Sequence, residues 1–477
     1  MNNKLNLAVA GAVLAFGAAS AQAGIIIPAG EWTLDVSGNV NTFYSNTNFS
    51  GSFEANTVAA TYSQIGTAIV VGTSAGTTPS AGSASGSITY VTKNVGGYTL
   101  NARTAGSALT KSANEVSTGL LPSAIGFGGK TRQNDIDVAF QTTFFVGANT
   151  STTGVGSWGN NNASLNSLNI RQAYLTFGDK SWGQFKLGRD LGVFGSDAIL
   201  SDMTLLGVGT GAGGAGSSTL GRIGSGYLYA DWIGQIQYQS PNFNGFQVTA
   251  AVREPLASST NHDLGVEGKA TFDFAANDVS GRIWLGGIHQ KISTAAVAAS
   301  TTLQSVGAFT TGTSTVTYLY DAGTSAFTKT AEAVEVGAKA SVAGFSVVGY
   351  YYDGKNIGLP SMLNSGIPAS GLTFNNADSA DHDVQGGYVQ GMFTVPGAGT
   401  KIGASWGRSE IEGTNIASAG GATTYSNESW IVGAYHPLTK HLNLVAEYTD
   451  AQFKNIQYYK GYDGHARTGS LGAILFF

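Results

Sequence analysis

The chain contains no cysteine among its 477 residues. This absence excludes disulfide bonds, thiolate metal sites and catalytic cysteines together. Charged residues are also scarce, at 11% of the chain with a formal net charge of −5, and no Lys- or Arg-rich run is present. Nucleic acid is therefore not expected as a partner, because neutralising phosphates requires clustered cations.

Long apolar segments are missing beyond the N-terminus, where no stretch reaches the roughly 20 residues that a membrane-spanning helix needs. If the chain crosses a membrane, it must do so as a closed barrel, because lipid leaves backbone groups no other way to form hydrogen bonds. Proline is rare, with 9 residues, whereas the chain has 68 Gly, 23 Phe and 20 Tyr. This mixture favours strands and turns, with the aromatic residues as candidates for girdles at the membrane interfaces.

Residues 1–23 have the pattern of a secretory signal peptide. Lys4 precedes an apolar run from Leu5 to Ala19, and Ala21-Gln22-Ala23 forms a small-x-small cleavage site. The alternative is a soluble N-terminal helix, but the run has no polar face. The sequence therefore predicts export, with a mature chain that begins at Gly24.

Apolar and polar residues alternate in many segments of the mature chain. Ile136, Val138 and Phe140 alternate with Asp137 and Gln141, the two-residue period of a strand with unlike faces. An even count near sixteen strands leaves an aqueous lumen in a barrel. We expect sixteen strands, at residues 31–44, 122–130, 135–147, 169–178, 184–189, 232–240, 245–254, 264–274, 279–290, 331–342, 345–353, 385–395, 400–409, 428–436, 441–450 and 466–477.

The connections between these segments distinguish a barrel from a soluble β-sandwich, which would show the same alternation. Short turns alternate with much longer stretches rich in Ser, Thr, Gly and Asn, as expected for periplasmic turns and extracellular loops. The longest stretch, about residues 45–121, is interpreted as an extracellular loop. A disordered linker or an inserted subdomain is the alternative, because structureless loops of this length are uncommon.

Three stretches resemble the general, non-specific porins of Gram-negative outer membranes, of the proteobacterial type. They are the strand-turn-strand segment 238–246, the hairpin that begins at Tyr435-His436-Pro437, and the alternating C-terminal segment 471–477. The resemblance implies an all-β fold, a 16-stranded antiparallel transmembrane β-barrel of residues 24–477, embedded in outer-membrane lipid and lipopolysaccharide. It also implies a homotrimer, and a terminal Phe477 that the barrel assembly machinery reads as its signal.

A further resemblance concerns the segment from Arg171 to Met203, which is similar to the porin region leading into the third loop. In the family this loop folds into the barrel and narrows it, which implies a constriction loop at about residues 190–231. A transverse field there would order water and orient polar solutes. The residues implied to line the constriction are Arg171, Lys186, Arg189 and Arg222, opposite Asp190, Asp197, Asp202 and Asp231.

The constriction region departs from the family pattern at several positions. Ala124 and Asp231 stand where further wall arginines are expected, and Thr204-Leu205-Leu206-Gly207-Val208 replaces an acidic loop tip. We therefore expect a less charged constriction, whose selectivity cannot be copied from the family.

Two segments fit enzyme motifs by spacing alone. Residues 72–76 fit a nucleophile elbow and residues 209–214 a dinucleotide fingerprint, but both motifs need a strand before and a helix after them, which the surrounding sequence does not predict. The six histidines lack metal-ligand spacing. Asp381-His382-Asp383 could hold a cation, although solvation in a loop explains it better. We expect no catalytic residue, no metal and no cofactor.

The function that these observations favour is passive diffusion of small hydrophilic solutes and ions through a water-filled pore. Three alternatives stay open. They are a substrate-specific channel, a surface protein whose enlarged loops bind a partner, and an outer-membrane phospholipase or protease with Ser, His and Asp brought together from distant loops.

Overall fold

The computed structural model describes residues 24–51, 68–70, 91–92, 112–148, 169–211, 218–255, 263–294, 300–304, 317–321, 327–358, 381–413, 424–454 and 463–477. The predicted signal peptide, the 72–76 motif and His262 lie outside these ranges. None of the helices in the described part of the chain has the length and apolar character needed to traverse a bilayer.

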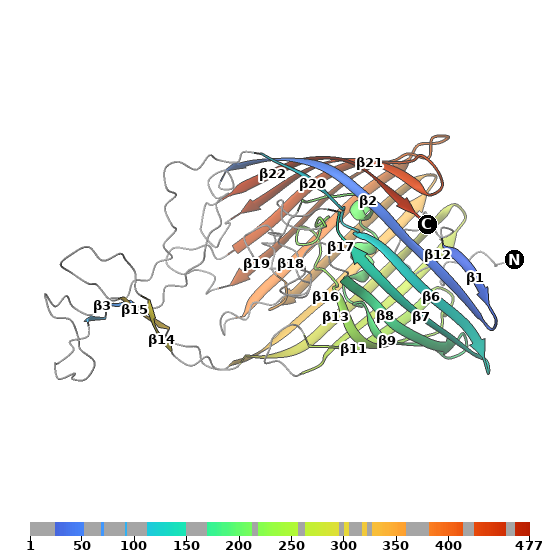
Figure 1. Ribbon diagram of the computed structural model, residues 1–477, viewed down its shortest axis with the longest axis horizontal. Coiled ribbons are helices and arrows are strands. Elements are labelled where there is room, and N and C mark those ends of the chain that lie inside the picture. The colour runs from blue at the N-terminus through green and yellow to red at the C-terminus, as the bar shows by residue number, and fades with distance from the viewer. Residues whose placement is uncertain are drawn as a thin grey trace.

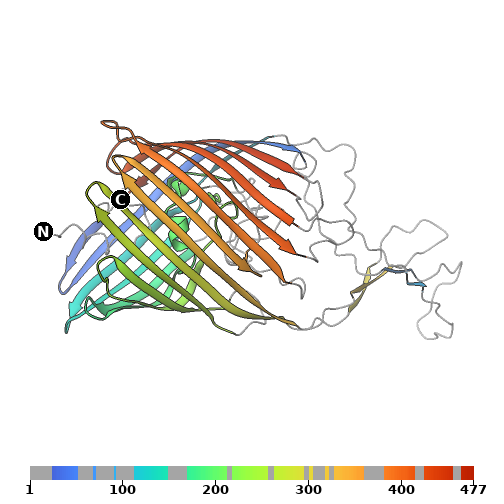
Figure 2. The ribbon, with the colours of Figure 1, turned by 180° about the vertical axis from the view of Figure 1, so that it is seen from behind.

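Sixteen antiparallel strands close into one barrel (Figures 1 and 2). Each strand pairs with the next one in the chain, and the last pairs back with the first, with Ile474 opposite Asn41. All sixteen predicted segments are strands of the barrel, so the predicted fold class is confirmed. The strands are β2 (Trp32–Gly51), β6 (Ser123–Gln133), β7 (Ile136–Val146), β8 (Asn169–Asp179), β9 (Gly183–Leu191), β10 (Trp232–Gln239), β11 (Phe246–Arg253), β12 (Gly265–Ala276), β13 (Val279–Thr294), β16 (Phe327–Val342), β17 (Phe345–Lys355), β18 (His382–Thr394), β19 (Lys401–Gly413), β20 (Thr424–Pro437), β21 (Leu442–Lys454) and β22 (Gly464–Phe476).

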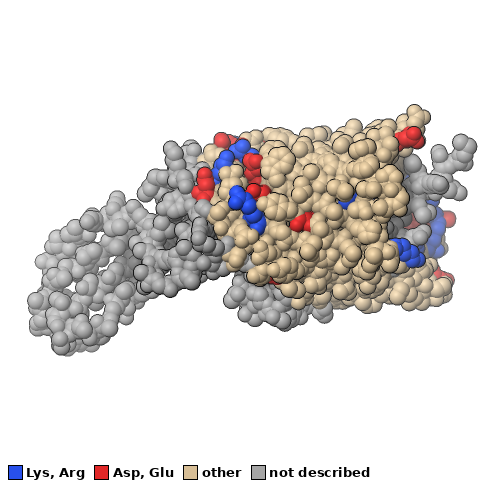
Figure 3. Space-filling view, turned by 90° about the horizontal axis from the view of Figure 1, so that it is seen from above, with Lys and Arg blue, Asp and Glu red and all other residues tan. Residues whose placement is uncertain are grey.

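The barrel wall has its apolar side outward and its polar side inward. On β16, Val334 and Val336 are 59% and 47% exposed, whereas Glu335 between them is 1% exposed. In the space-filling view of Figure 3, the charged residues lie mostly toward the two ends of the barrel, with a largely uncharged band between them. Period-two alternation with an apolar outer face is the pattern of a lipid-embedded barrel and excludes the soluble sandwich.

Two short strands complete the edges of β2. β1 (Ile25–Ala29) pairs with residues 32–36 of β2, which precede the part of β2 that pairs with β22. On the other edge of β2, β6 pairs with residues 33–39 and β5 (Ser112–Ser117) pairs with residues 43–48. Between β5 and β6, residues 118–122 interrupt the ladder, and Leu120 N–H donates to the carbonyl of Gly207 at 2.8 Å. The wall therefore contacts the third loop at this interruption.

The barrel closes at a seam where Gly38 and the C-terminal Phe477 exchange two backbone hydrogen bonds, of 2.8 and 3.1 Å. A Cβ atom on Gly38 would lie 2.2 Å from the Ala124 carbonyl oxygen and 2.9 Å from the Phe477 ring. Gly38→Val is therefore expected to lower the free energy of unfolding by about 1–3 kcal/mol through overpacking. Urea unfolding in detergent or lipid measures this effect. Gly391→Val, where a Cβ would meet nothing within 4 Å, is the control, and equal stability of both variants would contradict the role of the seam.

The two long connections at residues 52–111 and 295–326 pair with each other through backbone hydrogen bonds. β14 (Ser300–Gln304) and β15 (Thr317–Asp321) form a hairpin, β15 pairs with β3 (Ala68–Val70), and β3 pairs with β4 (Val91–Thr92). In Figure 1 this small sheet lies beyond the end of the barrel opposite the two termini. The strands that precede these connections are longer than predicted. β2 ends at Gly51 and β13 ends at Thr294, whereas the predicted ends were residues 44 and 290.

Candidate constriction site

The third long connection, between Leu191 at the end of β9 and Trp232 at the start of β10, runs through the barrel lumen (Figures 1 and 2). It contains α3 (Ser196–Leu200) and the 3-10 helix η2 (Met203–Leu206). Its apolar side chains pack against aromatic residues of the wall, so the loop forms part of an internal core. The buried cluster includes Phe194, Ala198, Ile199, Leu205, Leu220, Ile223, Tyr227, Leu228, Trp284, Tyr350, Tyr352 and Tyr388.

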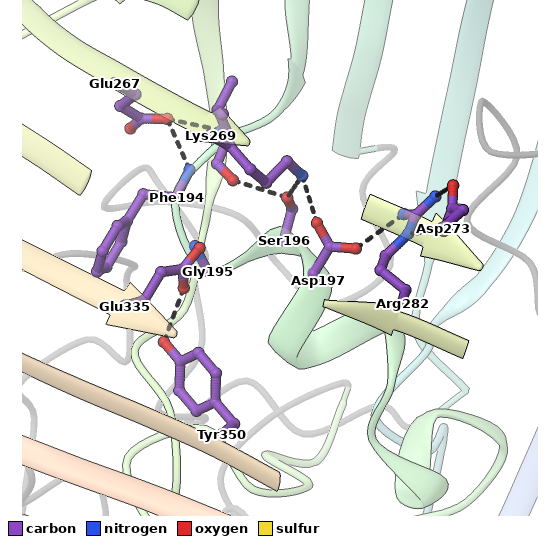
Figure 4. A network of polar contacts seen from close by, with 11 residues as sticks. Phe194, Gly195, Ser196, Asp197, Glu267, Lys269, Asp273, Arg282, Glu335 and Tyr350 are labelled. Carbon is purple, nitrogen blue, oxygen red and sulfur yellow. Dashed lines mark hydrogen bonds and ion pairs between the residues drawn. The ribbon is translucent and has the colours of Figure 1, made fainter. Parts of the chain in front are cut away.

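Wall glutamates hold the backbone of this loop. Each accepts hydrogen bonds from loop N–H groups through its buried carboxyl oxygens. Glu267 accepts from Val193 and Phe194, Glu335 from Gly195, and Glu447 from Val208 and Gly209, with N···O distances of 2.6–3.1 Å (Glu267 and Glu335 in Figure 4). Sequence reasoning missed these three residues as site residues. The available signal was acidic side chains on the inward face of predicted strands.

Asp197 of α3 is directed into the wall of β12 and β13. Its carboxylate pairs with Lys269 at 2.6 Å and with Arg282 at 3.0 Å, and Arg282 also pairs with Asp273 (Figure 4). Burial alone would raise the pKa of the Asp197 carboxyl, but the two cations outweigh burial and hold this pKa well below its usual value. The carboxylate therefore fixes α3 to the wall.

Asp202 is buried within the loop, at 4% exposure. Arg222 is buried between the loop and the wall, at 0% exposure. Asp202 accepts hydrogen bonds from the Tyr227 hydroxyl at 2.8 Å and from the Arg222 backbone N–H at 3.2 Å. The Arg222 guanidinium donates to the hydroxyls of Ser405 and Ser429 on β19 and β20. The structure thus places both residues where they tie the loop to itself and to the wall.

Arg171 occupies a β-bulge in β8. Opposite Thr143 lies Gln172 and opposite Phe144 lies Ile170, so Arg171 is the extra residue. A bulge redirects a side chain. Consequently Arg171 and Gln172 are both turned inward, at 6% and 3% exposure, while Ile170 is 47% exposed on the outer face.

Lys186 and Asp190 form an ion pair within β9, on the same part of the wall as Arg171. The Gln172 amide donates to the Asp190 carboxylate at 2.9 Å, and the Lys186 ammonium lies 4.8 Å from the centroid of the Tyr174 ring. Asp190, which was expected opposite the basic residues, therefore lies on the same strand as Lys186. The pair carries no net charge when both groups are ionised.

Asp231 lies at the end of the loop, where Arg171, Arg189 and Arg253 are close enough to interact with its charge. Its backbone has a φ of 58°, and its carboxylate accepts a hydrogen bond from the Trp232 N–H at 2.7 Å. Burial raises the pKa of the Asp231 carboxyl, and the hydrogen bond and the arginines only partly oppose this effect.

A pocket remains between the loop and the part of the wall formed by residues 120–122 and the strands β7 to β10. Its loop side is formed by Ile199, Leu200, Leu205, Ile223 and Tyr229. Its wall side is formed by Leu120, Leu121, Pro122, Phe145, Arg171, Gln172, Leu191 and Trp232. Among the described residues that line this pocket, Arg171 alone carries a charge, and the loop side is mostly aliphatic.

In the described residues, the candidate metal and nucleotide motifs make contacts of other kinds. No group of three or more His, Asp or Glu side chains suited to a metal was found there. Asp381 and Asp383 lie 3.8 and 3.9 Å from the Lys355 ammonium. Residues 209–211, the described part of the glycine motif, follow the 3-10 helix η2 instead of a strand, and the Gly209 N–H donates to Glu447.

A closed transmembrane barrel whose third loop packs inside the lumen defines an outer-membrane channel protein. The chain belongs to the Gram-negative porin family, whose model matches residues 103–456. This membership confirms the family resemblance and places the protein in the Gram-negative outer membrane.

Solved structures support the same fold at low sequence identity. The outer membrane channel DcaP of Acinetobacter baumannii is 12% identical, with a TM-score of 0.53, and the match covers 95% of this chain and 100% of that chain. OmpT of Vibrio cholerae, expressed in the outer membrane, is 13% identical, with a TM-score of 0.52 and the same coverage. No curated protein matches the chain.

Proposed function

We propose that the protein is a passive diffusion pore for small hydrophilic solutes and ions, narrowed by its third loop. The observation that carries this proposal is the loop fixed inside the lumen by wall side chains, with a pocket left between the loop and the wall beside Arg171. In this function, Arg171, Lys186, Arg189, Asp190 and Asp231 set the charge of the wall. Asp197, Asp202 and Arg222 keep the loop in place.

Several parts of the proposal rest on the sequence. Residues 1–23 serve as the signal peptide, and Phe477 is the signal for the assembly machinery. The chain assembles as a homotrimer, as the porin resemblance implies. No catalytic role is assigned to any residue, and a lipid or peptide hydrolysis assay is the direct test of that assignment.

The pore is expected to prefer anions, because Arg171 is the charged residue among the described residues that line the pocket beside the loop. Single-channel recording in planar bilayers should show current steps that are linear in voltage, with a reversal potential shifted toward the chloride equilibrium under a KCl gradient. Arg171→Gln should reduce this shift, whereas Arg467→Gln, on the exposed side of β22, should leave it unchanged. Absence of conductance, or cation preference in the wild type, would count against the proposal.

A substrate-specific channel is the second candidate, and the narrow, largely apolar pocket favours it. A specific channel would show currents that saturate with one solute. A diffusion pore would show conductance that rises in proportion to salt concentration.

A further inference from the structure

Three charged wall residues next to α3 are already paired. Lys269 pairs with Asp197 at 2.6 Å, and Arg282 pairs with Asp273 at 2.6 Å and with Asp197 at 3.0 Å (Figure 4). The Arg282 guanidinium donates through Nε and Nη2 to the Asp273 carboxylate and through Nη1 to Asp197. The charges of Lys269 and Arg282 are therefore matched by those of two carboxylates.

Lys339 of β16 is a further cation on this part of the wall. It lies directly opposite Arg282 in the ladder between β13 and β16, so the two side chains share the inner face of the barrel. The charge of Lys339 is close enough to interact with those of Arg282, Lys269, Asp197 and Asp273. No residue in the described part of the chain forms a hydrogen bond or an ion pair with the half-buried Lys339 ammonium. Its three N–H donors therefore remain available to a solute in the lumen.

Three serines lie beside Lys339 on the inner face, toward the short turns. Ser341 is two residues from Lys339 along β16, and Ser280 and Ser346 are its ladder partners in β13 and β17. Side chains two residues apart on a strand share a face and lie roughly 7 Å apart, and ladder partners lie about 5 Å apart. Within the described ranges, the three hydroxyls have no hydrogen-bond partner, and Ser280 and Ser341 are exposed. The serines thus add hydroxyl donors within reach of the long Lys339 side chain.

This set of donors suits an anion with several oxygen atoms. The ammonium supplies three donors and each hydroxyl supplies one. A phosphate group carries a charge of roughly −1.5 to −2 at neutral pH and presents several strong acceptor oxygens. Chloride offers no separate acceptor atoms, and a neutral sugar offers no charge to the lysine. Hydrogen bonds between ionised partners are about twice as strong as neutral ones, so phosphate gains most from these residues.

We propose that Lys339, together with the hydroxyls of Ser280, Ser341 and Ser346, forms a binding site for a phosphate group on the inner wall of the barrel. The solutes are inorganic phosphate and small phosphomonoesters. The site lies on β13, β16 and β17, apart from the pocket beside Arg171. This inference rests on the proposed pore function, because the solute reaches these residues through the lumen. Phosphate bound there reduces the current that KCl carries through the pore.

The test is the block of KCl current by inorganic phosphate in planar bilayers, with acetate as the comparison anion. Phosphate is expected to halve the current at a concentration at least about fivefold lower than acetate, because it offers more acceptor oxygens to the same donors. Lys339→Gln should raise the half-blocking phosphate concentration about tenfold, the loss expected for one charge-assisted hydrogen bond. Ser341→Ala should raise it about threefold.

Lys401→Gln is the matched control. Lys401 is a half-buried lysine on the inner face of β19, three strands away from Lys339, and in the described residues it has no hydrogen-bond or ion-pair partner either. Both substitutions remove one free positive charge from the lumen wall, and neither breaks an ion pair. Lys401→Gln should leave the half-blocking phosphate concentration unchanged. Heat-modifiable gel mobility confirms that each variant is folded.

The outcomes separate this inference from the pore proposal. If phosphate and acetate block equally, or if Lys339→Gln and Lys401→Gln weaken the phosphate block to the same extent, the site does not exist and the pore function stands. If the protein carries no KCl current, the pore proposal fails. Calorimetric titration of the folded barrel in detergent with inorganic phosphate then decides on the site. Saturable heat that Lys339→Gln weakens about tenfold and Lys401→Gln preserves would support the site, and its absence would overturn it.

Discussion

Replacing residues 196–228 with a short Gly-Ser linker is expected to raise the single-channel conductance several-fold. These residues include α3, η2 and the side chains that fill the lumen together with Trp284, Tyr350 and Tyr388. Sixteen strands enclose a lumen wide enough for an aqueous channel, so the barrel without this segment has a much larger open cross-section. Bilayer recording at one salt concentration measures the change directly.

The loop deletion needs a control for nonspecific effects of shortening the chain. Removing residues 359–380 between β17 and β18 tests a different long connection. Its conductance should remain close to that of the full-length protein. If both deletions raise conductance equally, or if the third-loop deletion leaves it unchanged, the third loop does not limit the current.

Glu267→Leu is expected to be the most damaging single substitution among the loop anchors. It removes the partner of Arg253, in a pair whose side chains are 3% and 0% exposed, and it leaves the Val193 and Phe194 N–H groups without their acceptor. Breaking a buried pair from one side typically costs about 3–5 kcal/mol, because the remaining charge is uncompensated. Urea unfolding should show this loss, and limited proteolysis should cut the loop faster.

Two further variants serve as controls for the Glu267→Leu result. In the double variant Arg253→Leu/Glu267→Leu the unpaired charge is absent, so stability should recover in part. Arg467→Ala breaks an exposed pair with Asp450 and should change stability by no more than about 1 kcal/mol. A Glu267→Leu variant as stable as Arg467→Ala would show that the carboxylate does not anchor the loop.

The barrel itself could be predicted from local patterns. Strand period two assigns Val334 and Val336 to one face and Glu335 to the other, and this assignment needs no knowledge of the neighbouring strands. Short turns and long connections then give the order and sidedness, because consecutive antiparallel strands pair with each other. All sixteen strands were obtained in this way, whereas the family was indicated by the resemblance of three stretches to known porins.

The partners of the loop could not be predicted in this way. The resemblance implied that Asp197 and Asp202 lie opposite a set of basic residues that includes Arg171. The structure instead pairs Asp197 with Lys269 and Arg282, on another part of the wall, and buries Asp202 beside Tyr227. The contact between Val208 and Glu447 joins residues 239 positions apart. No local period contains information about such a pair.

The sequence by itself determined the class of the protein, because alternation, turn chemistry and the aromatic C-terminus are local properties that only a transmembrane barrel satisfies together. The tertiary structure decided what the constriction presents to a solute. A single extra residue in β8 turns Arg171 inward, and closure of the barrel brings β12, β16 and β21 around the loop to bind its backbone. The charge and shape of the pocket beside Arg171 depend on these non-local contacts, which exist only once the barrel has closed.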